Sequence, residues 1–434
     1  MIETYAQRRS RLLNEMQHGI AIIPNAPEQR RNGDADFPYR FDSSFYYLSG
    51  FNEPESVLVL LAGQDGKSQS ILFCREKNLE REIWDGYRYG PEAACEAFGF
   101  DAAYPIVQLD EKLIELMANQ PTLFYPLGAN TGWDQRIIRL RAAVQEKSRS
   151  GIRAPNELHD VRTLINNMRL FKDLHEISLM RRAAIISADA HRCAMQFTRP
   201  GHFEYQVEAE LLHEFCRHGA RNPAYTSIVA GGANACVLHY VDNNAKLHDG
   251  DLLLIDAGCE LEGYASDITR TFPVNGRFLG AQKDVYEIVL ASQAAAIAKA
   301  QPGNNWEAPH HAALRVLAQG FIDLKLCHGT VDGVIENESY KQFYMHRTGH
   351  WLGLDVHDVG DYKIGDQWRP LQAGMVLTVE PGCYIRPADN VPIALWNIGI
   401  RIEDDVVITE TGHEVLTDAA PKTVNDIEEV MRHD

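Results

Sequence analysis

The strongest constraint in this sequence is a set of apolar, strand-like segments that carry acidic side chains. Residues 252–257 read Leu-Leu-Leu-Ile-Asp-Ala, and residues 264–272 hold Asp267 among apolar and hydroxyl-bearing neighbours. Residues 375–380 read Met-Val-Leu-Thr-Val-Glu and are followed by a proline, which cannot continue a strand ladder. Surface acids rarely have such apolar surroundings. We therefore expect strands that bring carboxylates together.

Asp256 and Asp267 flank a predicted hairpin. A symmetric hairpin with its turn centred between Leu261 and Glu262 sets the two acids directly opposite each other, on one face. The Cβ atoms of opposed residues lie about 4.5–5.5 Å apart, and like charges there are destabilising. We expect a positive charge between these carboxylates.

The other two acids of this kind are Glu380 and Glu403. In residues 399–408, Ile400 and Ile402 share one face of an expected strand, and Arg401 and Glu403 share the other. Four carboxylates and one neutral imidazole form a hard, oxygen-rich set that suits Mn²⁺ or a similar divalent ion. Five ligands are many for one catalytic ion, so we expect two ions bridged by two of the acids and a water.

Three histidines within twelve positions compete to supply the imidazole. His346, His350 and His357 would share one face of a helix, but the glycines at 349 and 353 disfavour a helix. Apolar residues recur at every second position from 352 to 356, which predicts a strand. Spacing alone does not decide which histidine binds metal.

The chain is long enough for two domains, since 434 residues exceed one ordinary core. The first part shows strands at 56–62, 70–74 and 122–125 and a helix at 110–117, typical of a small α/β domain. A basic, proline-punctuated stretch at 148–155 is the expected boundary region, and a long helix that begins at Asp173 opens an α+β second domain. Two further helices are expected near 281–300 and 306–320.

Composition argues against several classes of protein. A formal net charge of −18 argues against a nucleic-acid partner. No apolar run approaches the roughly 20 residues of a membrane span, and the N-terminus lacks the apolar core of a signal peptide, so no membrane partner is expected. The eight cysteines form no Cys-x-x-Cys pair, which predicts reduced thiols in a cytoplasmic protein.

Two histidine pairs outside this region are not expected to form sites. His213 and His218 lie five positions apart, so on a helix they point about 140° away from each other and do not form the His-Glu-x-x-His zinc pair. The pair His310 and His311 is interpreted as a solvated helix face.

Five ordered motifs resemble those of the pita-bread metallopeptidases. They are Ile255-Asp256-Ala-Gly, Ser266-Asp267-Ile-Thr-Arg, Gly349-His350-Trp-Leu-Gly-Leu-Asp-Val-His357-Asp, Thr378-Val-Glu380-Pro-Gly and Gly399-Ile-Arg401-Ile-Glu403-Asp. Phe37-Pro-Tyr-Arg40, Gly50-Phe-Asn-Glu-Pro54 and Glu82-Ile-Trp84 extend the resemblance to the aminopeptidase P (Xaa-Pro aminopeptidase) family and over nearly the whole chain. The resemblance implies an α+β fold with an N-terminal α/β domain at 1–168 and a pita-bread catalytic domain at 169–434.

The resemblance also implies a role for each motif residue. Asp256 would be a terminal ligand of one metal, His350 and Glu380 would bind the other, and Asp267 and Glu403 would bridge both. The implied substrate-side and supporting residues are His239, His346, His357, Tyr384 and Arg401. Trp84 is implied to reach a neighbouring subunit in a homo-oligomer, a dimer or a tetramer. The segment at 346–349, His-Arg-Thr-Gly, departs from the small-residue sequence expected there, which bears on the shape of the prolyl pocket.

The implied activity is release of the N-terminal residue from peptides with proline at position two. A hydroxide bridging two Mn²⁺ ions would attack the peptide carbonyl, Glu380 would shuttle the proton, and His357 and His239 would donate hydrogen bonds. Prolidase shares the metal motifs but accepts only dipeptides, and the first-domain motifs disfavour it. A methionine aminopeptidase needs no such N-terminal domain. A non-catalytic pita-bread module that binds peptides is the alternative from another functional class.

Overall fold

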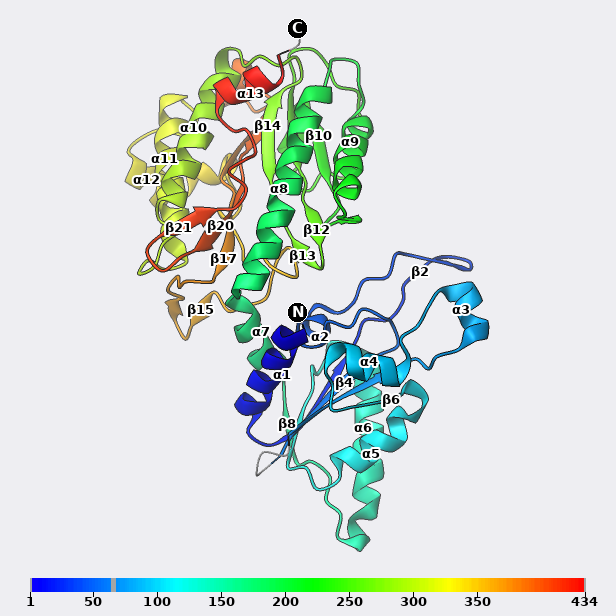
Figure 1. Ribbon diagram of the computed structural model, residues 1–434. Helices are drawn as coiled ribbons and strands as arrows, with labels where there is room; N and C mark the ends of the chain where they lie inside the picture. The colour runs from blue at the N-terminus through cyan, green and yellow to red at the C-terminus, as the bar shows by residue number, and fades with distance from the viewer. Residues whose placement is uncertain (1, 64–67, 433–434) are drawn as a thin grey trace. The chain divides into compact units, whose positions relative to one another are not determined.

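The computed structural model describes residues 2–63 and 68–432, and the chain divides into two compact units, Met1–Met168 and Arg169–Asp434 (Figure 1). Within these described ranges, no helix is both long and apolar enough to cross a membrane.

The first unit is built on a six-stranded mixed sheet in the order β6-β5-β4-β1-β7-β8. Strands β1 and β4 are antiparallel, whereas β1 and β7 are parallel. Apolar side chains from the sheet pack against α5 and α6, forming one core. The strands are β1 (Gly19–Pro24), β4 (Val57–Ala62), β5 (Gln69–Cys74), β6 (Ala102–Pro105), β7 (Thr122–Phe124) and β8 (Glu157–His159), and the helices are α1 (Ile2–Met16), α2 (Ser43–Ser49), α3 (Leu79–Asp85), α4 (Gly90–Phe98), α5 (Leu109–Met117) and α6 (Thr131–Glu146).

The predicted strands and helix of this unit are confirmed as β4, β5, β7 and α5. The stretch 148–155, expected as the boundary region, lies inside the first unit, because one more strand follows it and the two units divide between Met168 and Arg169. Strand β8 pairs in parallel with β7, and Ala154 is buried in the core of the same unit. The chain leaves the sheet only after β8, through α7 (Arg162–Leu170).

The second unit surrounds several short sheets with helices (Figure 1). Helix α8 begins where predicted, with Asp173 and Glu176 forming a capping box. The helices are α8 (Leu174–Phe197), α9 (Glu204–Arg217), α10 (Gly280–Ile297), α11 (Glu307–Asp323), α12 (Val331–Glu336) and α13 (Val424–Val430). The strands that position the candidate site are β10 (Ile228–Gly231), β11 (Leu252–Asp256), β12 (Cys259–Leu261), β13 (Tyr264–Ala265), β14 (Thr269–Pro273), β17 (Val376–Val379), β18 (Gly382–Ile385), β19 (Ile398–Arg401), β20 (Asp404–Ile408) and β21 (His413–Val415).

The hairpin that carries the first two acids is shifted from its predicted register. Glu262 and Gly263 form the turn with φ of 52° and 86°, a two-residue turn with both φ values positive. Leu261 therefore pairs with Tyr264, and Asp256 pairs with Thr269. The predicted pairing of Asp256 with Asp267 is wrong by two positions, because glycine's tolerance of positive φ moves the turn one residue along the chain.

The segment 399–408 forms two strands instead of one. Strand β19 pairs with β18, and β20 pairs with β17 and β21, so the chain changes sheets at Ile402 and Glu403. At this break the Glu403 amide donates to the Thr269 carbonyl at 3.0 Å. The Glu403 side chain therefore does not follow the alternation of faces along either strand, and Glu403 lies beside the start of β14.

The strand predicted over 352–356 is also wrong. Only Trp351 forms a bridge, with Leu377, and the chain then folds back so that the Asp358 amide donates to the Trp351 carbonyl at 2.9 Å. A Cβ built on Gly353 would lie 2.1 Å from the Asp358 carboxylate, so the tight fold requires glycine there. This reversal brings the rings of His350 and His357 within 4.1 Å of each other.

Candidate metal centre

All five predicted metal ligands line one cavity of about 450 Å³ in the second unit. Each comes from a strand end or from a break between strands, where side chains leave the sheet pattern. Asp256 ends β11, Asp267 precedes β14, Glu380 follows β17, Glu403 lies between β19 and β20, and His350 directly precedes Trp351. Five strand-associated segments thus meet at this cavity.

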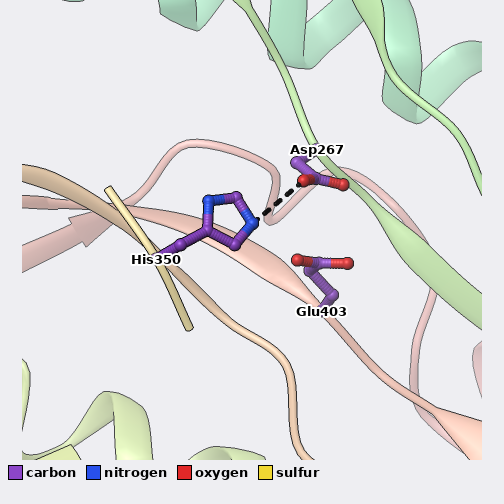
Figure 2. A group of neighbouring side chains, drawn as sticks. All are labelled: Asp267, His350 and Glu403. Carbon is purple, nitrogen blue, oxygen red and sulfur yellow. Dashed lines mark ion pairs between the residues drawn. The ribbon is translucent and has the colours of Figure 1, made fainter. Parts of the chain in front are cut away.

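Three of these side chains form a group that could hold a metal ion (Figure 2). One donor atom each from Asp267, His350 and Glu403 lies within 4.8 Å of the others, and His350 Nε2 lies 3.4 Å from Asp267 Oδ2. His350 Nδ1 donates to the Trp351 carbonyl at 2.9 Å, because a carbonyl can only accept. This bond orients the ring with Nε2 toward the carboxylates, as for a metal-binding imidazole.

Burial disfavours the ionised form of the carboxylates in this cluster. Burial, reinforced by the neighbouring acids, raises the pKa of Glu380 to about 7 and raises the pKa values of Asp267 and Glu403. Burial alone would lower the pKa of His350, but the hydrogen bond to Asp267 and the charges of Asp267 and Glu380 together outweigh it and raise that pKa to about 9. A divalent cation would favour the ionised carboxylates over their protonated forms, so the residues fit a metal site.

Arg401 orients two of the acids, Asp256 directly and Glu403 through Thr269. Its Nη2 donates to Asp256 Oδ2 at 2.6 Å, and its Nη1 donates to the Tyr384 hydroxyl at 2.9 Å. Its Nε donates to the Thr269 hydroxyl at 3.1 Å, which in turn donates to Glu403 Oε2 at 2.6 Å. Burial would lower the pKa of Arg401, but Tyr384 and the nearby carboxylates raise it well above its ordinary value, so the guanidinium stays charged.

Tyr225 belongs to the site and was missed by sequence reasoning. Its hydroxyl lies 2.6 Å from Asp256 Oδ1 and 2.5 Å from Asp267 Oδ1, between the two acids of the hairpin. Burial and these acids raise the pKa of Tyr225 well above its ordinary value, so the hydroxyl remains a donor. Tyr225 lies in a loop before β10 without any motif, so the sequence carries no signal for this role.

The remaining predicted histidines also line the cavity. His346 Nδ1 donates to the Arg347 carbonyl at 2.7 Å, which leaves Nε2 to accept from the Tyr384 hydroxyl at 2.8 Å. Burial lowers the pKa of His346 to about 3 and also lowers the pKa of His357, so both rings are neutral near pH 7. His239 is exposed on the cavity wall.

His310 corrects the prediction of a solvated pair on α11. Its Nδ1 lies 2.8 Å from the Thr348 hydroxyl, which also bonds to the Tyr344 hydroxyl at 2.6 Å. Burial lowers the pKa of His310 to about 4. Only His311 is exposed. His310 instead holds the segment between His346 and His350 through its hydrogen bond to Thr348.

Two other residues from the sequence analysis have different surroundings. Arg347, in the segment that departs from the expected pattern, pairs with Glu307 at 2.5 Å, and its guanidinium lies 5.1 Å from the Trp368 ring centre. Trp84 lies on α3 in the first unit with 82% of its surface exposed.

The model of metallopeptidase family M24 matches residues 178–410, which is more than half of the chain and includes every predicted metal ligand. The chain belongs to metallopeptidase family M24. In this M24 chain a second family model, the N-terminal domain of aminopeptidase P, matches residues 5–125. The predicted fold class, a pita-bread catalytic domain that follows a smaller N-terminal α/β domain, is confirmed. Membership of the M24 metallopeptidases also implies divalent metal ions and peptide substrates.

Known M24 relatives match almost the whole chain. The Xaa-Pro aminopeptidase of Escherichia coli is 45% identical over 430 residues, which cover 99% of this chain and 97% of that relative. The structure of aminopeptidase PepP from Pseudomonas aeruginosa is 49% identical, covers 99% of this chain and 98% of that one, and has a TM-score of 0.98. A zinc-substituted E. coli aminopeptidase P in complex with product is 45% identical, with the same coverage and a TM-score of 0.97.

Proposed function

We propose that this chain is an Xaa-Pro aminopeptidase, which releases the first residue of peptides whose second residue is proline. The observation that carries the proposal is the meeting of Asp267, His350 and Glu403 at the wall of an acid-lined cavity. The likeness to Xaa-Pro aminopeptidases over nearly the full chain supports the specificity. The catalytic machinery would lie in residues 169–434, with residues 1–168 as a separate domain.

We infer two divalent ions, with Mn²⁺ as the preferred metal. One imidazole among four carboxylates is a hard donor set. It suits this ion better than it suits metals that prefer thiolate ligands. Asp256 would bind one ion, His350 and Glu380 the other, and Asp267 and Glu403 both. When bound, the ions would make a water acidic enough to attack the peptide carbonyl near neutral pH.

The chain's own residues would then move protons and stabilise charge. Glu380 would accept a proton from the attacking water and deliver it to the departing prolyl nitrogen. His357 and His239 would donate hydrogen bonds to the substrate and to the oxyanion that develops at its carbonyl. His346, Tyr384 and Arg401 would keep these groups in place through the bonds described above.

Selectivity for proline would come from shape. The nitrogen of an Xaa-Pro bond carries no hydrogen, so an enzyme that must bind that N–H fails with these substrates. The cavity wall here includes the apolar side chains of Ile228, Leu238 and Val241, which could contact the ring. Trp84 would add to this pocket from a neighbouring subunit of a homo-oligomer.

All eight cysteines are free thiols, which supports a cytoplasmic protein.

A substrate-length series tests the proposal. Metal-depleted protein would be reloaded with Mn²⁺ or Zn²⁺ and assayed on Xaa-Pro, Xaa-Pro-Yaa and longer peptides, with Xaa-Ala-Yaa as the control. We expect metal-dependent cleavage of the proline peptides from three residues upward. Cleavage of the dipeptide alone would indicate prolidase. Two bound ions without any hydrolysis would indicate a peptide-binding module.

A further inference from the structure

A buried carboxylate outside the metal centre holds the segment that carries His239. Glu204, the first residue of α9, is fully buried and accepts four hydrogen bonds. Its Oε1 accepts from the Gly231 amide at 2.8 Å and the Asn234 side chain at 3.0 Å. Its Oε2 accepts from the Tyr240 hydroxyl and the Ala245 amide, both at 2.8 Å. A buried carboxylate is costly unless bonded in this way.

These four donors lie along residues 231–245, of which residues 232–236 form a short 3-10 helix. Gly231 ends β10, and the chain forms no regular strand or helix between 237 and 245. Such a segment has no ladder to fix its backbone, so side-chain bonds must do so. The segment carries Leu238, His239 and Val241, which line the cavity. His239 itself is exposed, so local packing alone leaves its position poorly determined.

Further contacts confine the same segment. The Glu204 amide donates to the Ala245 carbonyl at 3.0 Å, so this residue binds the segment through backbone and side chain together. A Cβ on Gly231 would lie 2.6 Å from a Leu247 methyl group, so a larger residue at 231 would displace Leu247. Burial and the bond to Glu204 raise the pKa of Tyr240 to about 12, so its hydroxyl remains a donor.

We propose that Glu204 is a positioning residue for the Xaa-Pro cleavage reaction, because it holds the segment 231–245 so that His239 faces the substrate. Glu204 does not itself line the cavity, so it acts only through His239. The inference rests on the proposed function and adds a residue to it.

Glu204→Gln is the sharpest variant, because it keeps the shape and changes the donors and acceptors. The new amide group must face one pair of donors. Tyr240 can turn its hydroxyl and Asn234 can flip its side chain, but the backbone N–H of Gly231 or Ala245 cannot adapt. One backbone amide therefore loses its acceptor in either orientation. The matched control is Glu214→Gln, on the same helix and also buried, which contacts His218 at 2.7 Å and not this segment.

The test is a double-mutant cycle with His239→Ala in the metal-loaded protein. We expect Glu204→Gln to lower kcat on an Xaa-Pro-Yaa peptide on the order of tenfold with metal content unchanged, and to have little further effect when His239 is already alanine. Hydrogen exchange within 231–245 should rise in Glu204→Gln and not in Glu214→Gln. Equal losses of kcat in both His239 backgrounds, full activity of His239→Ala, or unchanged exchange would overturn the proposal.

If Glu204→Gln does not fold, Tyr240→Phe removes one donor and leaves three on the carboxylate, and the same non-additivity with His239→Ala is expected on a smaller scale. If the wild-type protein cleaves no Xaa-Pro peptide, the proposed function fails. The exchange comparison then still decides whether Glu204 holds the segment, because it needs no substrate.

Discussion

The guanidinium of Arg401 donates to Oδ2 of Asp256 at 2.6 Å, at the back of the carboxylate cluster. The same side chain also reaches Tyr384 and Thr269, so one rigid fork aligns three acceptors. Arg401 on Oδ2 and Tyr225 on Oδ1 therefore fix the Asp256 orientation that an ion would meet.

Replacing Arg401 by lysine should lower activity without unfolding the protein. Lysine keeps the positive charge, but a single ammonium cannot reach all three acceptors at once. We expect a loss of about 10–100-fold in kcat or in metal affinity. Steady-state kinetics and metal titration measure both. A variant with wild-type values for both would show that the fork geometry is unimportant.

Asp267→Asn should remove bound metal and activity and leave a folded chain. The neutral amide cannot bridge two cations, and its Oδ position no longer carries the charge that an ion would need. Metal analysis with circular dichroism tests this. Two retained ions with normal activity would refute the bridging role.

His350→Ala and His357→Ala form a matched pair, since the two rings lie 4.1 Å apart on one folded segment. His350→Ala should lose metal. His357→Ala should keep its metal and lose about 10²–10³ in kcat, the usual cost of one preorganised donor. Metal analysis and kinetics on both variants separate the two roles. Loss of metal from His357→Ala would mean that His357 is a ligand.

Acid should destabilise the fold through His310. Its pKa in the folded protein is about 4, below the ordinary 6.5, so the unfolded chain binds the proton more tightly. This contribution is fully present above pH 6.5 and is lost as the pH falls toward 4. At about 1.4 kcal/mol per pKa unit, the stability lost by pH 5 is roughly 2 kcal/mol.

Denaturant titrations at pH 7.5 and pH 5 measure this effect, with metal concentration held constant. The loss of stability between the two conditions should shrink in His310→Gln. The control His213→Gln, at an exposed position of α9, should leave it unchanged. An equal loss in wild type and His310→Gln would count against a neutral, buried His310.

Much of the metal centre could be predicted because its acids stand in local sequence patterns. Asp256 and Glu380 end apolar runs, and strand ends are where side chains can leave the sheet for a cavity. The exact pairing of the hairpin could not be predicted, because it depends on which residue adopts positive φ. In the structure Glu262 and Gly263 both do so, and alternation of apolar residues alone does not mark which two residues form the turn.

Residues that join the site only through tertiary contacts could not be predicted from the sequence pattern. Tyr225 reaches Asp256 and Asp267 from a loop without a motif, and His310 bonds to Thr348 from a helix face that was predicted to be solvated. The fold-back after His350 depends on the space between Asp358 and Gly353. The contacts of Tyr225 and His310 join segments far apart in the chain, which periodicity within one segment cannot reveal.

The distribution of the cavity acids along the chain has a consequence for folding. Asp256 and Glu403 are contributed by distant segments that belong to different sheets, so the site forms only after those sheets have assembled. An ion that binds here would select the finished catalytic unit and could not nucleate it. Metal uptake during refolding should therefore report the last step of folding, after the helices and sheets have already formed.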